Sequence, residues 1–503
     1  MRTFAILCFV FSFTGFCAQN LQISRYYAGN AKNVPVHIYN HNASFFYVLR
    51  YNKSIHDFII ERRTKPGAEL SQIYPLRLDS VNSKWFDYEK LDYLLFENGG
   101  QLYFVFVKEL NNQSTVYFKC IDAAGKITGF NAVCTATADL TKASVRMEIE
   151  KDKNNNLLIT QRYRYSNQTA KTTVMCYDLQ QKKFLTQLQL PIENNYTGYS
   201  TAYTMAGDSN LYYLQVFSRV ASFSGQYTTQ GVAMVPLFIT DSLFLVKVST
   251  NAAIQRSKVP FTNLYHQFNV HILAAENTVA LVFRTAVESD SGLVHKFFTC
   301  KYRAVNLRLL SYSEMPLDAG ISKKLEYYDG SDNAKAGAKS FEGLNSFWQG
   351  STFNVLEGRR EQNYFKELLY WNFDTTGSVK VNQYLIPRKI FFFPNRTVYH
   401  KQAEVATVSE KNVYHLFVLE HRGNKTQRPQ EYKHRSFIKQ SQLRTGVLTQ
   451  YKVTGAGISK RTVFENNDFD WVPMVYDGWD KDFVFYLTKH KAEKWAILTD
   501  PAF

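Results

Sequence analysis

Basic residues recur where short apolar segments of the chain end, and aromatic residues gather in the polar segments between them. The basic candidates for ligand binding are Arg50, Lys108, Arg162, Arg164, Arg284 and Arg422. The aromatic candidates are Trp85, Tyr88, Tyr199, Tyr265 and Tyr399. On one face, the cations would attract an anionic partner, and the aromatic rings would stack on sugars or anchor peptides. Two plainer interpretations stay open: the cations only solvate a rim, and the rings pack between structural units.

No catalytic residue is assigned, because each candidate motif lacks the context that its chemistry requires. Gly198, Ser200 and Ala202 approximate the GxSxG pattern, but a nucleophile elbow needs a strand, a sharp turn and a helix on an α/β sheet. A set of carboxylates could form an acid and base pair for glycoside cleavage. These are Asp87, Glu89, Asp92, Asp468 and Asp470. The same carboxylates could equally balance nearby Arg and Lys charges.

The metal-binding patterns in the sequence are incomplete. Asp152 begins a segment similar to an EF-hand loop, but the twelfth position is Tyr163 rather than the bidentate Glu that calcium requires. His37 and His41 are four residues apart, which in a strand is about 13 Å, too far for one ion. The cysteines have no zinc-binding spacing. We therefore predict neither a metal nor a cofactor.

The composition excludes several classes of protein. The 503 residues include 59 Lys and Arg against 43 Asp and Glu, a formal net charge of +16. Hydrophobic residues make up 45% and charged residues 20%, which is close to globular usage and excludes disordered and collagen-like chains. Aromatic residues reach 16%, which favours strands. Ten Lys and Arg against one Glu lie between His421 and Arg461, so much of the charge excess falls in one segment.

The N-terminus predicts export. Residues 1–18 have a basic start at Arg2, an apolar run from Phe4 to Phe13 and small residues near Ala18. This pattern predicts a signal peptide cleaved near Ala18, and no other stretch is apolar over the length that spans a bilayer. We expect a secreted or periplasmic protein without a transmembrane segment. Four cysteines remain after cleavage, as buried thiols or as disulfides: Cys120, Cys134, Cys176 and Cys300.

One unit recurs along the whole chain. An alternating strand ends in a turn rich in Asn, Asp, Glu and Gly, and an apolar strand follows at once, which indicates a β-hairpin. The clearest copies end at Phe106, Thr160, Val216, Phe283, Val418 and Leu487. The second strands begin at eight positions from Phe45 to Phe483, about 63 residues apart on average. A second hairpin follows in every copy except the last, so the unit is four antiparallel strands.

This pattern resembles that of β-propeller repeat proteins, and more broadly of secreted bacterial-type proteins with no functionally named subfamily. It implies an all-β fold, an eight-bladed β-propeller of four-stranded antiparallel blades, with seven blades as the alternative. The single propeller domain would span residues 19–503 after a signal peptide at 1–18. The last copy is one strand short when the chain stops at Phe503. We expect Asn20–Tyr27 to supply that strand in the last blade and so to close the ring.

In such a ring, the loops between strands two and three and the loops between blades emerge on one face. Long loops are expected there at Ser218–Asp241 and Thr454–Asp468, among others. We expect a non-enzymatic propeller that binds an anionic glycan, an envelope polymer or an acidic protein on this face. Export makes nucleic acid an unsuitable partner. The alternative is a carbohydrate-active enzyme, a lyase or hydrolase acting on an acidic polysaccharide.

Overall fold

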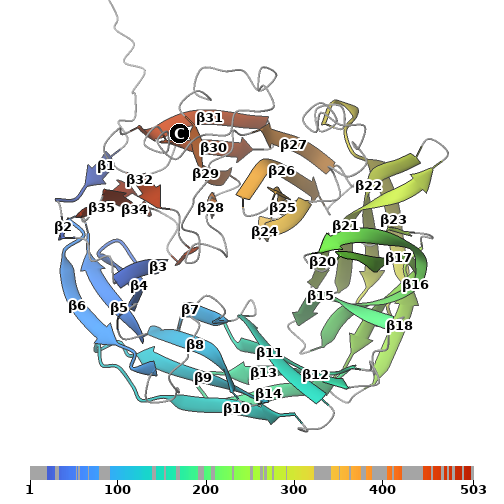
Figure 1. Ribbon diagram of the computed structural model, residues 1–503, viewed down its shortest axis with the longest axis horizontal. Helices are drawn as coiled ribbons and strands as arrows, with labels where there is room; N and C mark the ends of the chain where they lie inside the picture. The colour runs from blue at the N-terminus through green and yellow to red at the C-terminus, as the bar shows by residue number, and fades with distance from the viewer. Residues whose placement is uncertain are drawn as a thin grey trace, which may run out of the picture.

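The computed structural model describes residues 20–499, with larger gaps at 79–90, 191–196, 322–340, 388–404 and 422–445 and shorter gaps in other turns. The predicted signal peptide, 1–18, lies outside the described residues. The described part is all-β, and its sheets surround a central opening (Figure 1). Four-stranded antiparallel sheets recur around this ring, so the predicted β-propeller is confirmed. None of the helices found in the described ranges is long and apolar enough to cross a bilayer.

The blade between Tyr93 and Thr137 shows how the repeated sequence unit folds. Its strands lie side by side in chain order: β7 (Tyr93–Asn98), β8 (Gln101–Leu110), β9 (Gln113–Ile121) and β10 (Asn131–Thr137). Gly99 and Gly100 form the first turn with φ of 58° and 76°. A two-residue hairpin turn needs positive φ at both positions, which glycine adopts without steric cost. The turn signal read from the sequence therefore sets the register of this hairpin.

Other blades repeat this strand order. One consists of β11 (Ala143–Lys151), β12 (Leu157–Tyr165), β13 (Ala170–Asp178) and β14 (Lys183–Gln189). Another consists of β24 (Phe341–Gln349), β25 (Thr352–Glu361), β26 (Tyr364–Asp374) and β27 (Val381–Pro387). A third consists of β28 (Val405–Glu410), β29 (Val413–His421), β30 (Gly446–Thr454) and β31 (Gly457–Glu465). The blade nearest the N-terminus consists of β3 (Asn33–Asn40), β4 (Phe45–Asn52), β5 (Asp57–Thr64) and β6 (Leu70–Pro75).

One sheet of nine strands contains two four-stranded groups. The first group is β15 (Thr197–Met205), β16 (Leu211–Thr228), β17 (Gly231–Val248) and β18 (Ile254–Lys258). The second group is β20 (Asn269–Ala274), β21 (Thr278–Ser289), β22 (Gly292–Arg303) and β23 (Leu309–Pro316). The short strand β19 (Leu264–Tyr265) pairs with both β17 and β21 and so joins the two groups.

Two of the expected long loops are strands. The prediction at Ser218–Asp241 is wrong, because β16 and β17 stay paired out to Thr228 and Gly231. The prediction at Thr454–Asp468 is also wrong, because β31 covers most of that segment and pairs with β30. Both segments contain Gly and Ser residues that are typical of loops. Pairing with a neighbouring strand outweighs that local preference.

The hydrophobic core lies between blades. Leu158 and Val174 of one blade pack in one cluster with Tyr213 and Val246 of the next. Aromatic rings also meet across blades: Phe297 lies 4.9 Å from Trp371, and Phe417 lies 4.3 Å from Phe483, between ring centroids. Fully burying one such side chain stabilises the fold by about 1.5–3 kcal/mol. Much of the aromatic content therefore serves packing between blades.

The two ends of the described chain close the ring as predicted. The last blade contains β32 (Asp470–Val472), β34 (Asp482–Lys489) and β35 (Ala492–Thr499). Strand β1 (Asn20–Ile23) pairs antiparallel with β35, from Asn20 with Thr499 to Ile23 with Ala496, and β2 (Tyr27–Ala28) pairs with the start of β35. A feature absent from the sequence prediction is β33 (Val475–Gly478), which pairs in parallel with β3 of the N-terminal blade. Each end of the chain thus contributes a strand to the blade formed by the other end.

Cys120, Cys134, Cys176 and Cys300 all lie in the described part of the chain and form no disulfide, which decides between the two alternatives left by the sequence. Cys120, Cys176 and Cys300 are buried, and Cys134 is half-buried. Burial raises the pKa of Cys134 to about 11 and the pKa of Cys300 to about 12. These two thiols are therefore protonated and unreactive at neutral pH.

Removal of residues 19–28 should open the ring at β35. The backbone N–H of Trp495 donates to Ser24 Oγ at 2.9 Å, and its carbonyl accepts from the Ser24 N–H at 2.8 Å. Without β1 and β2, the fully buried Trp495 would gain access to water. We expect a lower melting temperature and a red-shifted tryptophan emission. An unchanged melting temperature would contradict this role of the N-terminal strands.

Candidate functional site

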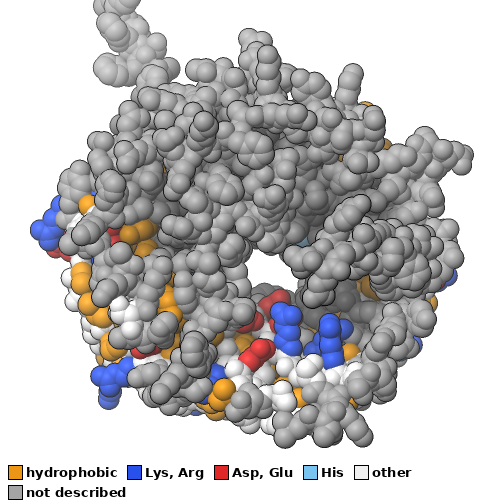
Figure 2. Space-filling view, viewed as in Figure 1, with side chains coloured by type: hydrophobic (Ala, Val, Ile, Leu, Met, Phe, Trp, Pro, Cys, Tyr) orange, Lys and Arg blue, Asp and Glu red, His pale blue; other side chains and the backbone are white. Residues whose placement is uncertain are grey.

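Charged side chains line the central opening on the blades that begin with β7 and β11 (Figure 2). Polar residues alternate with apolar ones along the inner strand β11. Arg146, Glu148 and Glu150 are exposed, whereas Met147 and Ile149 are buried against the neighbouring blade. Arg146 Nε lies 3.2 Å from Glu148 Oε1. One alternating strand thus presents a row of charges to the opening.

Asp92 brings a third carboxylate to this wall. Its Oδ2 accepts the backbone N–H of Ile149 at 3.3 Å, which fixes the carboxylate beside β11. The side chain of Glu150 reaches solvent, but the surrounding protein desolvates it in part and so raises its pKa, and the negative charges of Glu148 and Asp92 raise the pKa further. A carboxyl group that keeps its proton closer to neutral pH can act as a general acid.

Sequence reasoning named Asp92 but missed Glu148 and Glu150. The available signal was the alternation of charged and apolar residues from Val145 to Lys151, which marks the two faces of one strand. The structure does not describe the side chains of the other four candidate carboxylates. Asp87, Glu89 and Asp468 lie outside the described residues, and only the backbone of Asp470 is described, in β32.

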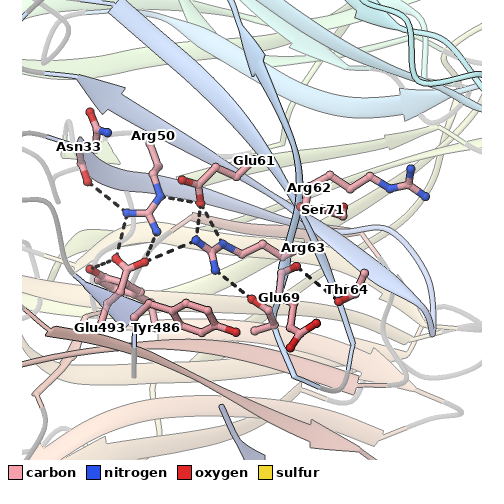
Figure 3. A network of polar contacts seen from close by, with 12 residues as sticks. Asn33, Arg50, Glu61, Arg62, Arg63, Thr64, Glu69, Ser71, Tyr486 and Glu493 are labelled. Carbon is pink, nitrogen blue, oxygen red and sulfur yellow. Dashed lines mark hydrogen bonds and ion pairs between the residues drawn. The ribbon is translucent and has the colours of Figure 1, made fainter. Parts of the chain in front are cut away.

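Arg50 was predicted to lie on an exposed basic rim, but it is buried where the first and last blades meet (Figure 3). Its guanidinium makes a bidentate contact with Glu493 of β35, at 2.8 and 3.1 Å, and its Nε lies 2.9 Å from Glu61 of β5. Arg63 contacts the same Glu61 oxygen at 2.8 Å. Burial alone would lower the pKa of Arg50, but Glu61 and Glu493 raise it above its ordinary value. Arg50 therefore stays charged and joins two blades.

Arg284 was also predicted to lie on the exposed rim, but it is buried. It lies in β21, and its Nε donates to Glu357 Oε2 of β25 at 2.7 Å. The two side chains are 4% and 0% exposed. This pair connects two neighbouring blades, as the contact of Arg50 with Glu493 does. At these two positions, the recurrent basic residue neutralises a buried carboxylate of the adjacent blade.

The remaining predicted ligand-binding residues fall into three groups, according to how much of each the structure describes. Lys108 of β8 is half-buried, and burial lowers its pKa. Arg162 of β12 is half-buried opposite Arg146, and Arg164 is exposed two residues later. For Tyr199 in β15 and Tyr265 in β19, only the backbone is described. Outside the described residues lie Arg422, Trp85, Tyr88 and Tyr399. The predicted ligand-binding role stays a prediction.

Across the described ranges, no group of three or more His, Cys, Asp or Glu side chains could hold a metal ion. His37 and His41 take separate partners: the ring of His37 lies 6.0 Å from that of Tyr93, and His41 Nδ1 lies 2.6 Å from Glu97 Oε2. His41 also stacks on Phe45 at 4.4 Å.

No family model and no curated protein matches the chain. Among solved structures, the WD40 domain of SCAP from fission yeast matches with 6% identity and a TM-score of 0.38, over 96% of this chain and 99% of that one. The β-propeller domain of Vanderwaltozyma polyspora Nup133 matches with 9% identity and a TM-score of 0.31, over 81% and 99%. An acylaminoacyl peptidase from Pyrococcus horikoshii matches with 9% identity and a TM-score of 0.35, over 92% and 60%.

Arg284→Ala should destabilise the protein strongly, because it leaves the fully buried Glu357 without its cation. Breaking one side of a buried ion pair costs about 3–5 kcal/mol. Arg164→Ala removes an exposed guanidinium and should change the free energy of unfolding by no more than about 0.5 kcal/mol. Chemical denaturation of both variants measures the difference. If the double variant Arg284→Met with Glu357→Met were as unstable as Arg284→Ala, the unpaired charge would not be the cause.

Proposed function

We propose that the protein is a secreted or periplasmic, non-enzymatic β-propeller that binds an anionic glycan, an envelope polymer or an acidic protein. The proposed binding face carries the loops between strands two and three and the loops between blades. We assign to this face Arg422 and the other basic residues of the connection from β29 to β30, up to Arg444. We infer eight blades, because the strands group into eight sets of four when β1 is counted with the last blade and the nine-stranded sheet is counted as two.

The observation that carries this proposal is that the buried charges cancel, which leaves the net positive charge to the other residues. Among the described residues, the charged residues that are buried as a whole are five cations and five anions. The cations are Arg50, Arg63, Lys119, Lys247 and Arg284. The anions are Asp57, Glu61, Glu357, Asp482 and Glu493. These ten charges cancel, so the net charge of +16 belongs to the rest of the chain. A surface with that excess attracts anionic partners and repels cationic ones.

Binding to acidic polysaccharides should therefore weaken as salt screens the charges. The test is a polysaccharide array probed at low and high ionic strength. The variant Arg422→Ala, Lys425→Ala should bind at least about fivefold more weakly, the effect of about 1 kcal/mol. Arg303→Ala, Arg308→Ala makes the same change of charge on the opposite face and serves as the control. If binding is absent at low salt, or if both variants lose it equally, the proposed face is wrong.

The channel wall favours a second candidate, a carbohydrate-active lyase or hydrolase on an acidic polysaccharide. The raised pKa of Glu150 beside Glu148 and Asp92 suits a general acid. Glu150→Gln keeps the shape of the side chain and removes its acidic proton. We expect reducing ends or unsaturated products from the unaltered protein and a loss of at least about a hundredfold in rate from this variant. Binding without any product in either protein would exclude this candidate.

A further inference from the structure

Exposed large apolar side chains collect at one place in the blades. Nine such residues are found among the described residues. Six lie in the turn before the fourth, outermost strand of a blade or within the first three residues of that strand: Leu70, Phe184, Leu185, Ile254, Val305 and Leu310. The fourth strands become buried toward their other ends, as at Tyr74, Leu188 and Val259. Apart from Ile73, which is 50% exposed in the second half of β6, exposure of large apolar side chains is thus confined to one end of these strands.

Blade topology places these residues on a single face of the ring. The four strands of each blade are antiparallel, so the turns between strands one and two and between strands three and four emerge on the same side. This side, here called the turn face, is opposite to the face proposed above to bind an anionic partner. The six apolar residues lie in or just before four strands, β6, β14, β18 and β23, on the left, lower and right parts of the ring (Figure 1). They form a set of separate anchors around the circumference.

Basic side chains accompany the apolar ones. Exposed cations in or beside the turns before the fourth strands are Lys126, Lys182, Lys183, Arg303 and Arg308. Three acidic residues lie in the corresponding turns, fewer than these five cations. Asp122 Oδ1 accepts the Lys126 N–H at 2.8 Å, and Asp178 Oδ1 accepts the Gln180 N–H at 2.8 Å. Glu69 lies 3.4 Å from Arg25. The turn face therefore combines shallow apolar side chains with a positive excess.

We propose that the turn face docks on an anionic lipid surface. Apolar side chains flanked by Lys and Arg bind membrane interfaces by burying apolar area and by attraction to acidic headgroups. The clearest anchor is the start of β14, where Lys182 and Lys183 precede Phe184 and Leu185, which are 40% and 44% exposed. Val305, at 67% exposed, provides a second anchor between Arg303 and Arg308.

The spacing of the anchors favours a membrane over a protein partner. A protein interface concentrates its binding energy in one contiguous, desolvated patch. Here the described apolar residues are distributed over separate blades of the ring. A fluid, flat, negatively charged surface can engage all of them at once. Each anchor then contributes a small free energy, and the contributions add through multiple attachment.

The test is sedimentation of the purified full chain with two kinds of vesicle, phosphatidylcholine alone and phosphatidylcholine with phosphatidylglycerol. We expect binding only to the anionic vesicles and release at high salt. Lys182→Ala with Lys183→Ala should lower the partition coefficient roughly thirtyfold, since each cation near an acidic surface contributes about 1 kcal/mol. Phe184→Ser with Leu185→Ser should lower it at least about tenfold, because both inserted side chains are lost.

Leu110→Ser with Tyr165→Ser is the matched control. These residues are 39% and 38% exposed but end second strands, on the opposite face. Should the Phe184 and Leu185 variant melt at a lower temperature, Val305→Ser in an exposed turn gives an independent test. Equal loss of vesicle binding in the control, or no binding to anionic vesicles, would overturn the proposal. A concentration-dependent dimer that the same turn-face variants abolish, without vesicle binding, would also overturn it and identify a second copy as the occupant.

Discussion

The whole structure depends on the seam where the two ends of the chain meet. A single four-stranded blade exposes two apolar faces, and each face is buried only when a neighbouring blade lies on either side. The ring must therefore close, or two blades would keep an open face. Closure is achieved by β1 and β2 pairing with β35, by β33 pairing with β3, and by a shared apolar cluster that includes Phe46 and Trp495.

The charged side chains at this seam are buried, and they form ion pairs with one another. Arg50, Arg63, Glu61 and Glu493 cancel one another, and Arg63 also donates to the carbonyl of Ala68 at 2.9 Å. Nearby, Lys65 Nζ lies 2.6 Å from Asp482 Oδ1, across the same pair of blades. Buried ion pairs add little net stability compared with apolar packing, but a mispaired one is costly. The seam network thus favours one alignment of the first and last blades over slipped alternatives.

The cancellation of charges in the interior also determines where the net positive charge of the protein lies. Because the buried charges cancel, the cationic excess is left to the half-buried, exposed and undescribed residues. In our two proposals, the faces of the ring differ in their chemistry. One face carries the basic and aromatic connections expected from the sequence, and the other presents turns in which apolar side chains lie beside basic ones. Two faces of different chemistry would let a single ring lie against a surface and hold a partner on its free side.

The sequence by itself determined the repeat and the strand pairing within each unit, because hairpin turns and alternating strands are set by nearby residues. It also determined the closure by Asn20–Tyr27, because the last unit lacks one strand and this segment has the pattern of a fourth strand. It did not determine whether Arg50 and Arg284 are exposed or buried. A basic residue at a strand end has the same local sequence whether it contacts water or a carboxylate that is distant in the chain. Glu493 is 443 residues from Arg50, and Glu357 is 73 from Arg284. The parallel pairing of β33 with β3 and the gathering of Asp92 with Glu150 likewise arise only when blades are brought side by side. Contacts between blades have no local sequence signal, and only the tertiary structure decided them.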